Sequence, residues 1–256
     1  MGRAVPRLSG ALPPRFADTE WSPPSRADEQ AALAEAAPDE IIAALSPLVV
    51  PTRRERIDRV AAGRLAGVAL VLEDLHDPHN GGAALRSCEA VGLCEVHVIQ
   101  DKERFRTSSR VTQGCDKWLD VVQHRDTGAC LRSLRARGFR LYAAVPSAAR
   151  RLEELDPLAP AAFLIGNEHA GLTPEARALC DEQFTIPMHG FSESMNLSVA
   201  TAITLYTHTS RRRAALGHDG DLDEARLAEL RARYYVRDVR GAVAVVRRHR
   251  QQADAR

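Results

Sequence analysis

Five polar residues stand in three separated blocks of this chain, and their side chains are suited to holding a polar ligand. Asn80 and Arg86 lie in the first block, Glu168 in the second, and Ser194 with Asn196 in the third. Each block follows an apolar, strand-like run and enters a glycine-rich turn or the start of a helix. Open α/β sheets bind their ligands at the carboxyl ends of strands. The three blocks therefore predict a ligand-binding or catalytic site.

Several common chemistries lack their sequence signatures. No Gly-x-Gly-x-x-Gly follows the first apolar run, and the turn there reads Asp-Pro-His-Asn-Gly-Gly over residues 77–82. The phosphate-binding Gly-x-x-x-x-Gly-Lys-Ser/Thr and the nucleophile motif Gly-x-Ser-x-Gly are also absent. His76 and His79 are spaced three residues apart in a loop, without a further cluster of ligands nearby in the sequence. We therefore expect no metal site and no metal requirement.

The elements that position these blocks alternate between strands and helices. Helices are expected around 80–91, where Asn80 suits an N-cap, at 127–137, after Thr173 and Pro174, and from Met195 or Asn196 to about Arg213. This alternation predicts a parallel α/β sheet flanked by helices. The expected strands are Val68–Glu73, Glu95–Ile99, Lys117–Val122, Arg140–Val145, Ala161–Ile165 and Gln183–Ile186.

The ends of the chain differ from this core. Residues 1–50 are rich in proline, alanine and acidic residues, and we expect them to be mostly disordered, with a short helix at 28–37. Residues 51–66 are expected to form a basic helix whose apolar side carries Ile57, Val60 and Leu65. The core domain is expected over 67–215, followed by a basic helical tail over 216–256.

Charge is distributed unevenly although the whole chain has a net charge of only +1. Residues 1–50 hold four arginines against seven acidic residues, whereas residues 51–66 hold five against two and residues 211–256 twelve against seven. Two arginine-rich flanks indicate a polyanionic partner. The alternative is that the arginines form only a solvated helix surface.

The cysteines and the apolar runs bear on location. The five cysteines form no Cys-x-x-Cys pair and are odd in number, which favours reduced thiols over a disulfide framework. The N-terminus lacks the continuous apolar segment of a secretory signal. No apolar run approaches the ~18 residues that a membrane span needs. We expect a cytoplasmic protein without a membrane partner.

The three blocks together resemble the SPOUT superfamily of knotted methyltransferases, in particular the TrmH family of RNA ribose 2′-O-methyltransferases. They read HNGGAALR at 79–86, LIGNEHAGL at 164–172 and IPMHGFSESMNLSVA at 186–200. The segment HDPHN at 76–80 is most similar to the branch that methylates guanosine 18 of tRNA. The resemblance covers about residues 52–214.

The resemblance implies S-adenosylmethionine as cofactor and tRNA as substrate. It implies that Ala144, Gly166, Ile186 and Met195 hold the cofactor. Asn80, Arg86, Glu168, Ser194 and Asn196 match the catalytic positions. It also implies a C-terminal deep trefoil knot and a homodimer formed through core helices, including the one after Met195 with Val199, Ile203 and Leu205, so that Arg86 serves the partner's active site.

RNA contacts are expected from four arginines, Arg53 and Arg54 in the basic helix and Arg211 and Arg212 near the end of the core. Relatives tend to carry arginine at two positions that are Ser210 and Arg212 here, so Arg211 is a candidate substitute for the first.

Alternative roles stay open for the catalytic candidates. Arg86 acts either as a base after a phosphate contact or as a holder of phosphate and developing alkoxide charge, and the second suits a guanidinium that stays protonated. Glu168 either faces the ligand or anchors its loop through backbone amides. Ser194 and Asn196 either face the ligand, cap a helix, or do both.

Two other functions compete with tRNA methylation. One is 2′-O-methylation of ribosomal RNA, whose TrmH relatives usually carry a compact N-terminal RNA-binding domain. The proline-broken, acidic residues 1–50 do not fit that domain. The other is an RNA-binding module that has lost catalysis, against which the complete set of polar and cofactor positions argues.

Overall fold

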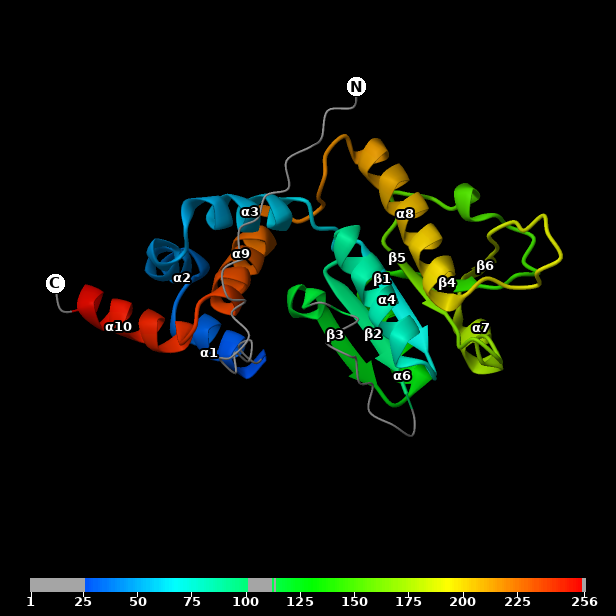
Figure 1. The fold of residues 1–256 in the computed structure, drawn as a ribbon, viewed down its shortest axis with the longest axis horizontal. Helices are drawn as coiled ribbons and strands as arrows, with labels where there is room; N and C mark the ends of the chain where they lie inside the picture. The colour runs from blue at the N-terminus through cyan, green and yellow to red at the C-terminus, as the bar shows by residue number, and fades with distance from the viewer. Residues whose placement is uncertain (1–25, 101–111, 113, 255–256) are drawn as a thin grey trace, which may run out of the picture.

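The protein, seen in a computed structural model that describes residues 26–100, 112 and 114–254, contains a six-stranded parallel sheet (Figure 1). The strand order is β3-β2-β1-β5-β4-β6, so β1 and β5 lie at the centre. Both central strands are buried along their whole length, as the apolar runs predict for strands covered on two faces. The strands are β1 (Val68–Glu73), β2 (Glu95–Ile99), β3 (Asp120–His124), β4 (Arg140–Ala144), β5 (Ala161–Ile165) and β6 (Glu182–Phe184).

Helices cover both faces of the sheet, which confirms the predicted α/β class. On one face, α4 (Pro78–Ala90) and α8 (Leu197–Leu216) pack over Leu70, Leu72 and Phe163. On the other, α6 (Thr127–Ala136) and α7 (Pro174–Leu179) pack over Val71 and Leu164. None of the helices in the described part of the chain is long and apolar enough to cross a membrane.

Some element boundaries differ from those that the sequence predicts. The N-cap of α4 is Asp77, not Asn80, because the Asp77 carboxylate accepts from the backbone N–H of His79 at 2.8 Å and Pro78 takes the first helical position. The short 3₁₀ helix η2 (Cys115–Trp118) occupies the start of the expected third strand. Strand β6 ends at Phe184, two residues early.

A separate lobe is built from helices at both ends of the chain (Figure 1). Its helices are α1 (Arg26–Glu35), α2 (Pro38–Leu45), α3 (Pro51–Ala62), α9 (Glu224–Asp238) and α10 (Ala242–Asp254). The helices share a hydrophobic core in which Ile41 and Leu45 of α2 lie with Tyr235 of α9 and Val246 of α10.

The short helix expected at 28–37 is present as α1, but the expectation of disorder is wrong for the rest of residues 26–50, and residues 1–25 lie outside the described residues. Helices α1 and α2 bury their apolar sides, but the partners are α9 and α10, nearly 200 residues away in the sequence. A segment that buries too little apolar surface by itself gains enough once a distant segment supplies the other half of a core.

Buried ion pairs join this lobe to the sheet. Glu29 of α1 is 4% exposed, and its Oε2 accepts from Nη2 of Arg237 at 2.9 Å and from Nε of Arg233 at 3.3 Å. The same two arginines donate to Asp120 of edge strand β3, at 2.8 Å from Arg237 and 2.6 Å from Arg233. Two carboxylates and two guanidiniums thus compensate one another where α1, α9 and β3 meet.

A second buried pair closes the sheet domain. Arg212 of α8 donates to Asp221 at 2.8 Å and also to the carbonyl oxygens of Pro157, Leu158 and Ala159. Asp221 in turn accepts from the backbone N–H groups of Ala66 and, at 3.0 Å, Gly67. This arrangement fixes the end of α8, the segment before β5 and the entry into β1.

We expect Glu29→Gln to lower the free energy of unfolding by about 3 kcal/mol, because it leaves the buried Arg237 and the half-buried Arg233 short of one compensating charge. Equilibrium denaturation measures the change. Glu55→Gln, which alters an exposed carboxylate of α3, is the matched control and should shift stability by less than ~0.5 kcal/mol. Equal stabilities for the two variants would contradict a structural role for the Glu29 pair.

Candidate active site

Four adjacent strands deliver the candidate residues to one edge of the sheet. The strands β1, β5, β4 and β6 are neighbours in that order and run parallel, so their carboxyl ends lie side by side. Asn80 follows β1, Glu168 follows β5, and Asn196 lies between β6 and α8. The fold thereby brings Asn80 together with Glu168 and Asn196, which lie 88 and 116 positions later in the chain.

Asn80, Glu168 and Asn196 are joined in a chain of hydrogen bonds. The Nδ2 of Asn80 donates to Oε1 of Glu168 at 2.6 Å. The Nδ2 of Asn196 donates to Oδ1 of Asn80 at 3.1 Å. Each amide thus has a fixed orientation, because a carboxylate only accepts when it is ionised. One residue from each of the three sequence blocks takes part.

A neighbouring asparagine, which we did not select from the sequence, anchors the loop that carries Glu168. The Oδ1 of Asn167 accepts from the backbone N–H groups of His169 at 2.9 Å and Ala170 at 2.6 Å. The anchoring role considered for Glu168 therefore belongs to Asn167. The second carboxylate oxygen of Glu168, Oε2, is buried and has no hydrogen-bond partner among the described residues, which leaves an acceptor available to a ligand.

The third block contributes one residue to the hydrogen-bond chain and leaves one outside it. Asn196 is the N-cap of α8, where its Oδ1 accepts from the backbone N–H groups of Ser198 at 2.9 Å and Val199 at 3.4 Å. Its amide nitrogen still reaches Asn80, so the residue caps the helix and faces the site at once. Ser194 is exposed and stands apart from these contacts.

The four residues expected to hold a cofactor lie at or after strand ends on the same edge of the sheet. Ala144 ends β4, Gly166 directly follows β5, Ile186 follows β6 and Met195 precedes α8. Ala144, Ile186 and Met195 are half-buried, so each keeps some surface for a ligand. The strand ends that carry the first three, those of β4, β5 and β6, are adjacent in the sheet.

Gly166 is required by the loop itself. A Cβ atom at this position would lie 2.0 Å from the carbonyl carbon of Gly171, which is far inside van der Waals contact. The loop between β5 and α7 therefore folds back on its own backbone, and only glycine permits this close approach. Gly166 shapes the edge at which a cofactor would bind, whether or not its own backbone contacts the cofactor.

Arg86 lies away from Asn80 within the same subunit. Six residues of α-helix advance by about 9 Å and turn the side chain by roughly 120°. Arg86 is exposed and lines a cavity of about 340 Å³ together with Arg53 and Arg56 of α3 and with Trp118. The cavity is basic and carries an aromatic ring, with the Arg53 guanidinium 5.1 Å from the Trp118 ring centre.

The cavity also contains a thiol, Cys115, at the start of η2. Burial is the main cause that raises the pKa of Cys115 to about 11, and the neighbouring Asp116 carboxylate adds to it. The thiol is protonated near neutral pH and is a weak nucleophile in this state. This cavity is therefore suited to binding an anionic ligand, not to cysteine-based covalent chemistry.

The four arginines predicted to contact RNA have different surroundings. Arg212 is buried and committed to Asp221 and three carbonyl groups, so its assignment as an RNA contact is wrong. Arg53 pairs with Asp238 at 2.6 Å, and Arg211 donates to the carbonyl of Leu155 at 2.9 Å. Arg54 is half-buried.

Two other arginines of α3, Arg56 and Arg59, are exposed and make no ion pair with any residue that the structure describes. Helical periodicity in the sequence could have identified these two arginines as exposed. Because Ile57 and Val60 face inward, helical periodicity turns Arg56 and Arg59 outward.

Comparison with known proteins identifies the family to which the chain is similar. Residues 67–206 match the SpoU rRNA Methylase family. The chain is 36% identical over 166 residues to the tRNA (guanosine(18)-2′-O)-methyltransferase of Escherichia coli K12, covering 64% of this chain and 72% of that protein. It is 35% identical over 163 residues to the 23S rRNA (guanosine-2′-O-)-methyltransferase RlmB of Xanthomonas axonopodis pv. citri, covering 63% of this chain and 65% of that protein.

Solved structures agree with the sequence relatives. The TrmH/SpoU tRNA modifying enzyme of A. aeolicus superposes with a TM-score of 0.67 at 27% identity, covering 74% of this chain and 98% of that one. The SpoU methyltransferase AviRb of Streptomyces viridochromogenes, in complex with AdoMet, superposes with a TM-score of 0.54 at 26% identity, covering 57% and 60%. With three sequence blocks meeting at one sheet edge and more than half of its length matched, this chain belongs to the SpoU rRNA Methylase family.

Proposed function

We propose that this protein transfers a methyl group from S-adenosylmethionine to the ribose 2′-hydroxyl of guanosine 18 in tRNA. The observation that carries the proposal is the hydrogen-bonded chain Asn80–Glu168–Asn196 at the carboxyl edge of the sheet, with a buried Glu168 oxygen that has no partner in the described part of the chain. The tRNA (guanosine(18)-2′-O)-methyltransferases among its relatives support the choice of nucleotide.

The cofactor supplies the methyl group on a sulfonium, which makes it transferable to an oxygen nucleophile. The protein's own task is to hold the ribose hydroxyl in line with that methyl group and to help it lose its proton. Asn80 and Asn196, each fixed by its neighbours, are placed to hold the ribose. The buried Oε2 of Glu168, to which no described residue donates, can accept a hydrogen bond from the bound ligands.

Ala144, Gly166, Ile186 and Met195 would hold the cofactor. Their positions at adjacent strand ends, the half-buried apolar side chains and the close backbone approach at Gly166 fit a flat adenosine bound against backbone amides and carbonyls. Because these residues are uncharged, they do not repel a cationic sulfonium.

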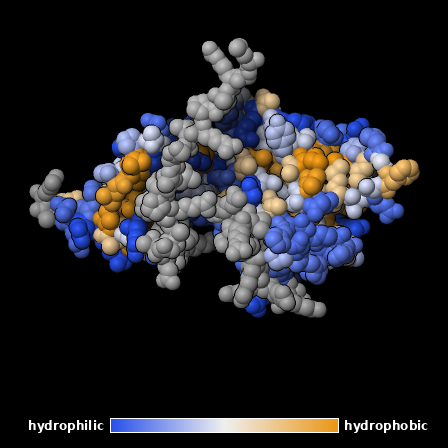
Figure 2. All heavy atoms as spheres, in the orientation of Figure 1, coloured by the Kyte–Doolittle hydropathy of each residue, from blue (hydrophilic) through white to orange (hydrophobic). Residues whose placement is uncertain are grey.

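A knotted chain and a homodimer complete the proposal. The segment between β4 and β5, which includes η3 (Leu152–Glu154), pairs with Thr185 after β6 and accepts hydrogen bonds from Arg211 and Arg212 of α8. These contacts bring the chain before β5 against the chain after β6, as a knot would require, and support this part of the proposal. For the dimer, Val199 and Tyr206 of α8 are 47% and 68% exposed and seven residues apart, so they share one helix face. Figure 2 shows hydrophobic surface over this helix. Ile203 and Leu205, by contrast, pack in the subunit's own core.

The dimer gives Arg86 a role. Since Arg86 faces the cavity with Arg53 and Arg56, we propose that it holds a phosphate of the tRNA bound in the active site of the partner subunit. A guanidinium bound to phosphate also stabilises negative charge developing on the ribose oxygen.

The cytoplasm is the compartment we propose, because all five cysteines are free thiols.

Ribosomal RNA is the second candidate substrate, favoured by the similarity to a 23S rRNA methyltransferase. An RNA-binding module without catalysis is a weaker candidate, because such a module has no need of the Asn80–Glu168–Asn196 chain.

One experiment separates these three functions. Incubation with labelled S-adenosylmethionine and either total tRNA or ribosomal RNA should label tRNA, and mapping should place the label on the ribose of guanosine 18. Label confined to ribosomal RNA, or no label, would overturn the proposal.

Arg86→Ala should slow methyl transfer at least ~100-fold, which is about 2.7 kcal/mol of transition-state stabilisation. Its affinity for S-adenosylmethionine should change by less than ~3-fold, because Arg86 lies away from the strand ends that would hold the cofactor. Calorimetric titration and single-turnover kinetics measure the two effects separately. Loss of cofactor binding with an unchanged single-turnover rate at saturating cofactor would disprove the assignment.

Mixing two inactive variants tests whether Arg86 acts across the dimer. A heterodimer of Arg86→Ala and Glu168→Ala subunits retains one complete site only if Arg86 serves the partner. Random exchange should then restore roughly a quarter of wild-type activity. No recovery after exchange would place Arg86 in the active site of its own subunit.

Arg56→Ala should lower the slope of log affinity for tRNA against log salt by about one unit, since one phosphate contact is lost. Filter binding over a series of salt concentrations gives the slope. Arg231→Ala is the control, because Arg231 already pairs with Asp58 at 2.9 Å and should contribute little to the slope. Equal slopes for both variants and the wild type would remove α3 from the RNA-binding surface.

A further inference from the structure

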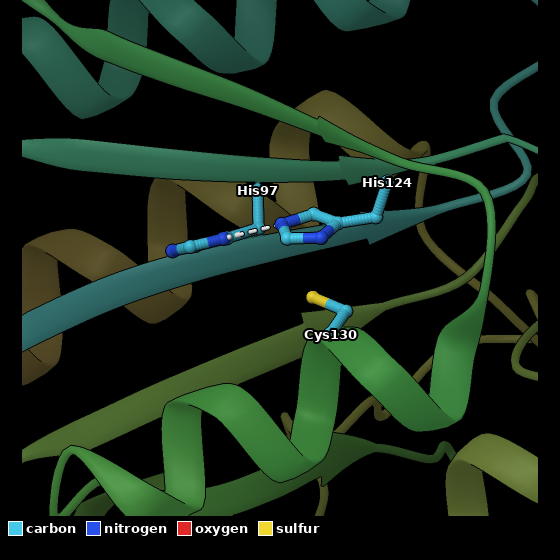
Figure 3. A group of neighbouring side chains, drawn as sticks. All are labelled: His97, His124 and Cys130. Atoms are coloured by element: carbon cyan, nitrogen blue, oxygen red, sulfur yellow. Dashed lines mark hydrogen bonds between the residues drawn. The ribbon is translucent and has the colours of Figure 1, made fainter.

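Three potential metal ligands meet under α6, on the sheet face opposite α4 (Figure 3). The Nδ1 of His97 lies 2.9 Å from Nε2 of His124. One ring nitrogen of each histidine and the Sγ of Cys130 all lie within 4.8 Å of one another. His97 and Cys130 are buried, and His124 is half-buried.

The register of the sheet places the two imidazoles together. In the parallel pair of β2 and β3, His97 is opposite Val122 and Ile99 is opposite His124. Residues in register, and residues two apart on one strand, point to the same face of a sheet. His97 and His124 therefore both face α6. Cys130 faces the sheet from α6, in the same hydrophobic cluster as Ile99.

We propose that His97, His124 and Cys130 bind a zinc-type transition metal ion. Two imidazoles and one thiolate are ligands that such ions favour. Three protein ligands leave a fourth coordination position, which a water molecule would fill. His124 is half-buried, so water can reach this side of the site. Two nitrogens at zinc bond lengths in a tetrahedral site lie roughly 3.3–3.4 Å apart. The present separation must open by about 0.4 Å, and the two rings, which now face each other in a hydrogen bond, must turn so that both nitrogens point at the ion.

The groups behind His97 resemble the usual support of a metal-binding histidine. Such a histidine presents its other ring nitrogen to a carboxylate, which fixes the tautomer. The Nε2 of His97 is buried and lies 3.6 Å from Oε1 of Glu95, and Arg137 holds the same carboxylate at 2.6 Å. A proton on Nε2 leaves Nδ1 with a lone pair that can bind the ion.

Metal binding has a definite proton balance. With the proton of His97 on Nε2, the 2.9 Å contact in the metal-free pair is a hydrogen bond that Nε2–H of His124 donates to Nδ1 of His97. When the ion binds, that proton moves to Nδ1 of His124, both facing nitrogens bind the ion, and the Cys130 thiol releases one proton to solvent. The ion would fasten edge strand β3 and strand β2 to α6. Since the Asn80–Glu168–Asn196 chain does not take part, methyl transfer itself should not need the metal.

The test uses the full chain, stripped of metal by chelation and titrated with Co²⁺ and with Zn²⁺. Co²⁺ should give a thiolate-to-metal absorption band at one ion per chain, and Zn²⁺ should displace it and raise the melting temperature. Cys130→Ser should abolish the band, and His97→Gln or His124→Gln should weaken Zn²⁺ binding at least ~10-fold. Methyl transfer by the stripped enzyme should stay within ~2-fold of the untreated enzyme.

Two controls keep the test decisive. Cys180→Ser alters another thiol packed on the same hydrophobic cluster and should bind Co²⁺ like the wild type. His76→Gln alters a histidine in the loop after β1 and should also leave binding unchanged. A wild-type chain without the thiolate band, or a Cys130→Ser chain that retains it, would overturn the proposal. The wild-type result stands even if a variant fails to fold.

Discussion

The buried pair between Arg212 and Asp221 is the contact on which the architecture depends. It ties the last turn of α8 to the chain before β5 and to the backbone entering β1, so it holds the two central strands and the helix that follows the third sequence block in one arrangement. These are the elements from which Asn80, Glu168 and Asn196 project. Isolated charges are costly in a protein interior, but here each guanidinium and carboxylate group finds several partners. The pair therefore specifies geometry more than it adds stability.

The polar groups of the active site are assembled by folding alone. Asn196 is fixed as a helix cap, Asn167 stiffens the loop before Glu168, and Gly166 lets that loop turn back on itself. Preorganised groups of this kind need little rearrangement during a reaction, which is the main source of electrostatic catalysis. The basic cavity around Arg86 is separate within one subunit, so placement of the substrate and alignment of the ribose fall to different surfaces.

Local sequence patterns predicted the sheet well, because its signals are local. Buried apolar runs located five of the six strands within a residue or two, and the polar residues after them marked the functional edge. The errors came from information that the local sequence lacks. Asp77 displaced Asn80 as a helix cap because both have the required chemistry and only the path of the turn decides between them. Arg212 lies in an arginine-rich segment of the kind that contacts RNA. Only its pairing with Asp221, nine residues later, shows that its side chain is buried inside the protein. The helix at 28–37 was predicted, but α2 and the packing of both helices were missed because their hydrophobic partners lie near the other end of the chain.

The acidic N-terminal helices and the basic C-terminal helices together form one lobe with a shared core. Glu29 pairs with Arg233 and Arg237, Glu35 pairs with Arg247, and Asp58 pairs with Arg231, so much of the arginine excess of the tail is neutralised inside the lobe. Neither end is then an independent module for recombination. A chimera that exchanges only one of them between related enzymes would set like charges or unmatched apolar faces against each other, whereas exchange of both ends together preserves the lobe. Over evolutionary time, substitutions in the two ends should be inherited as matched pairs although almost 200 residues separate them.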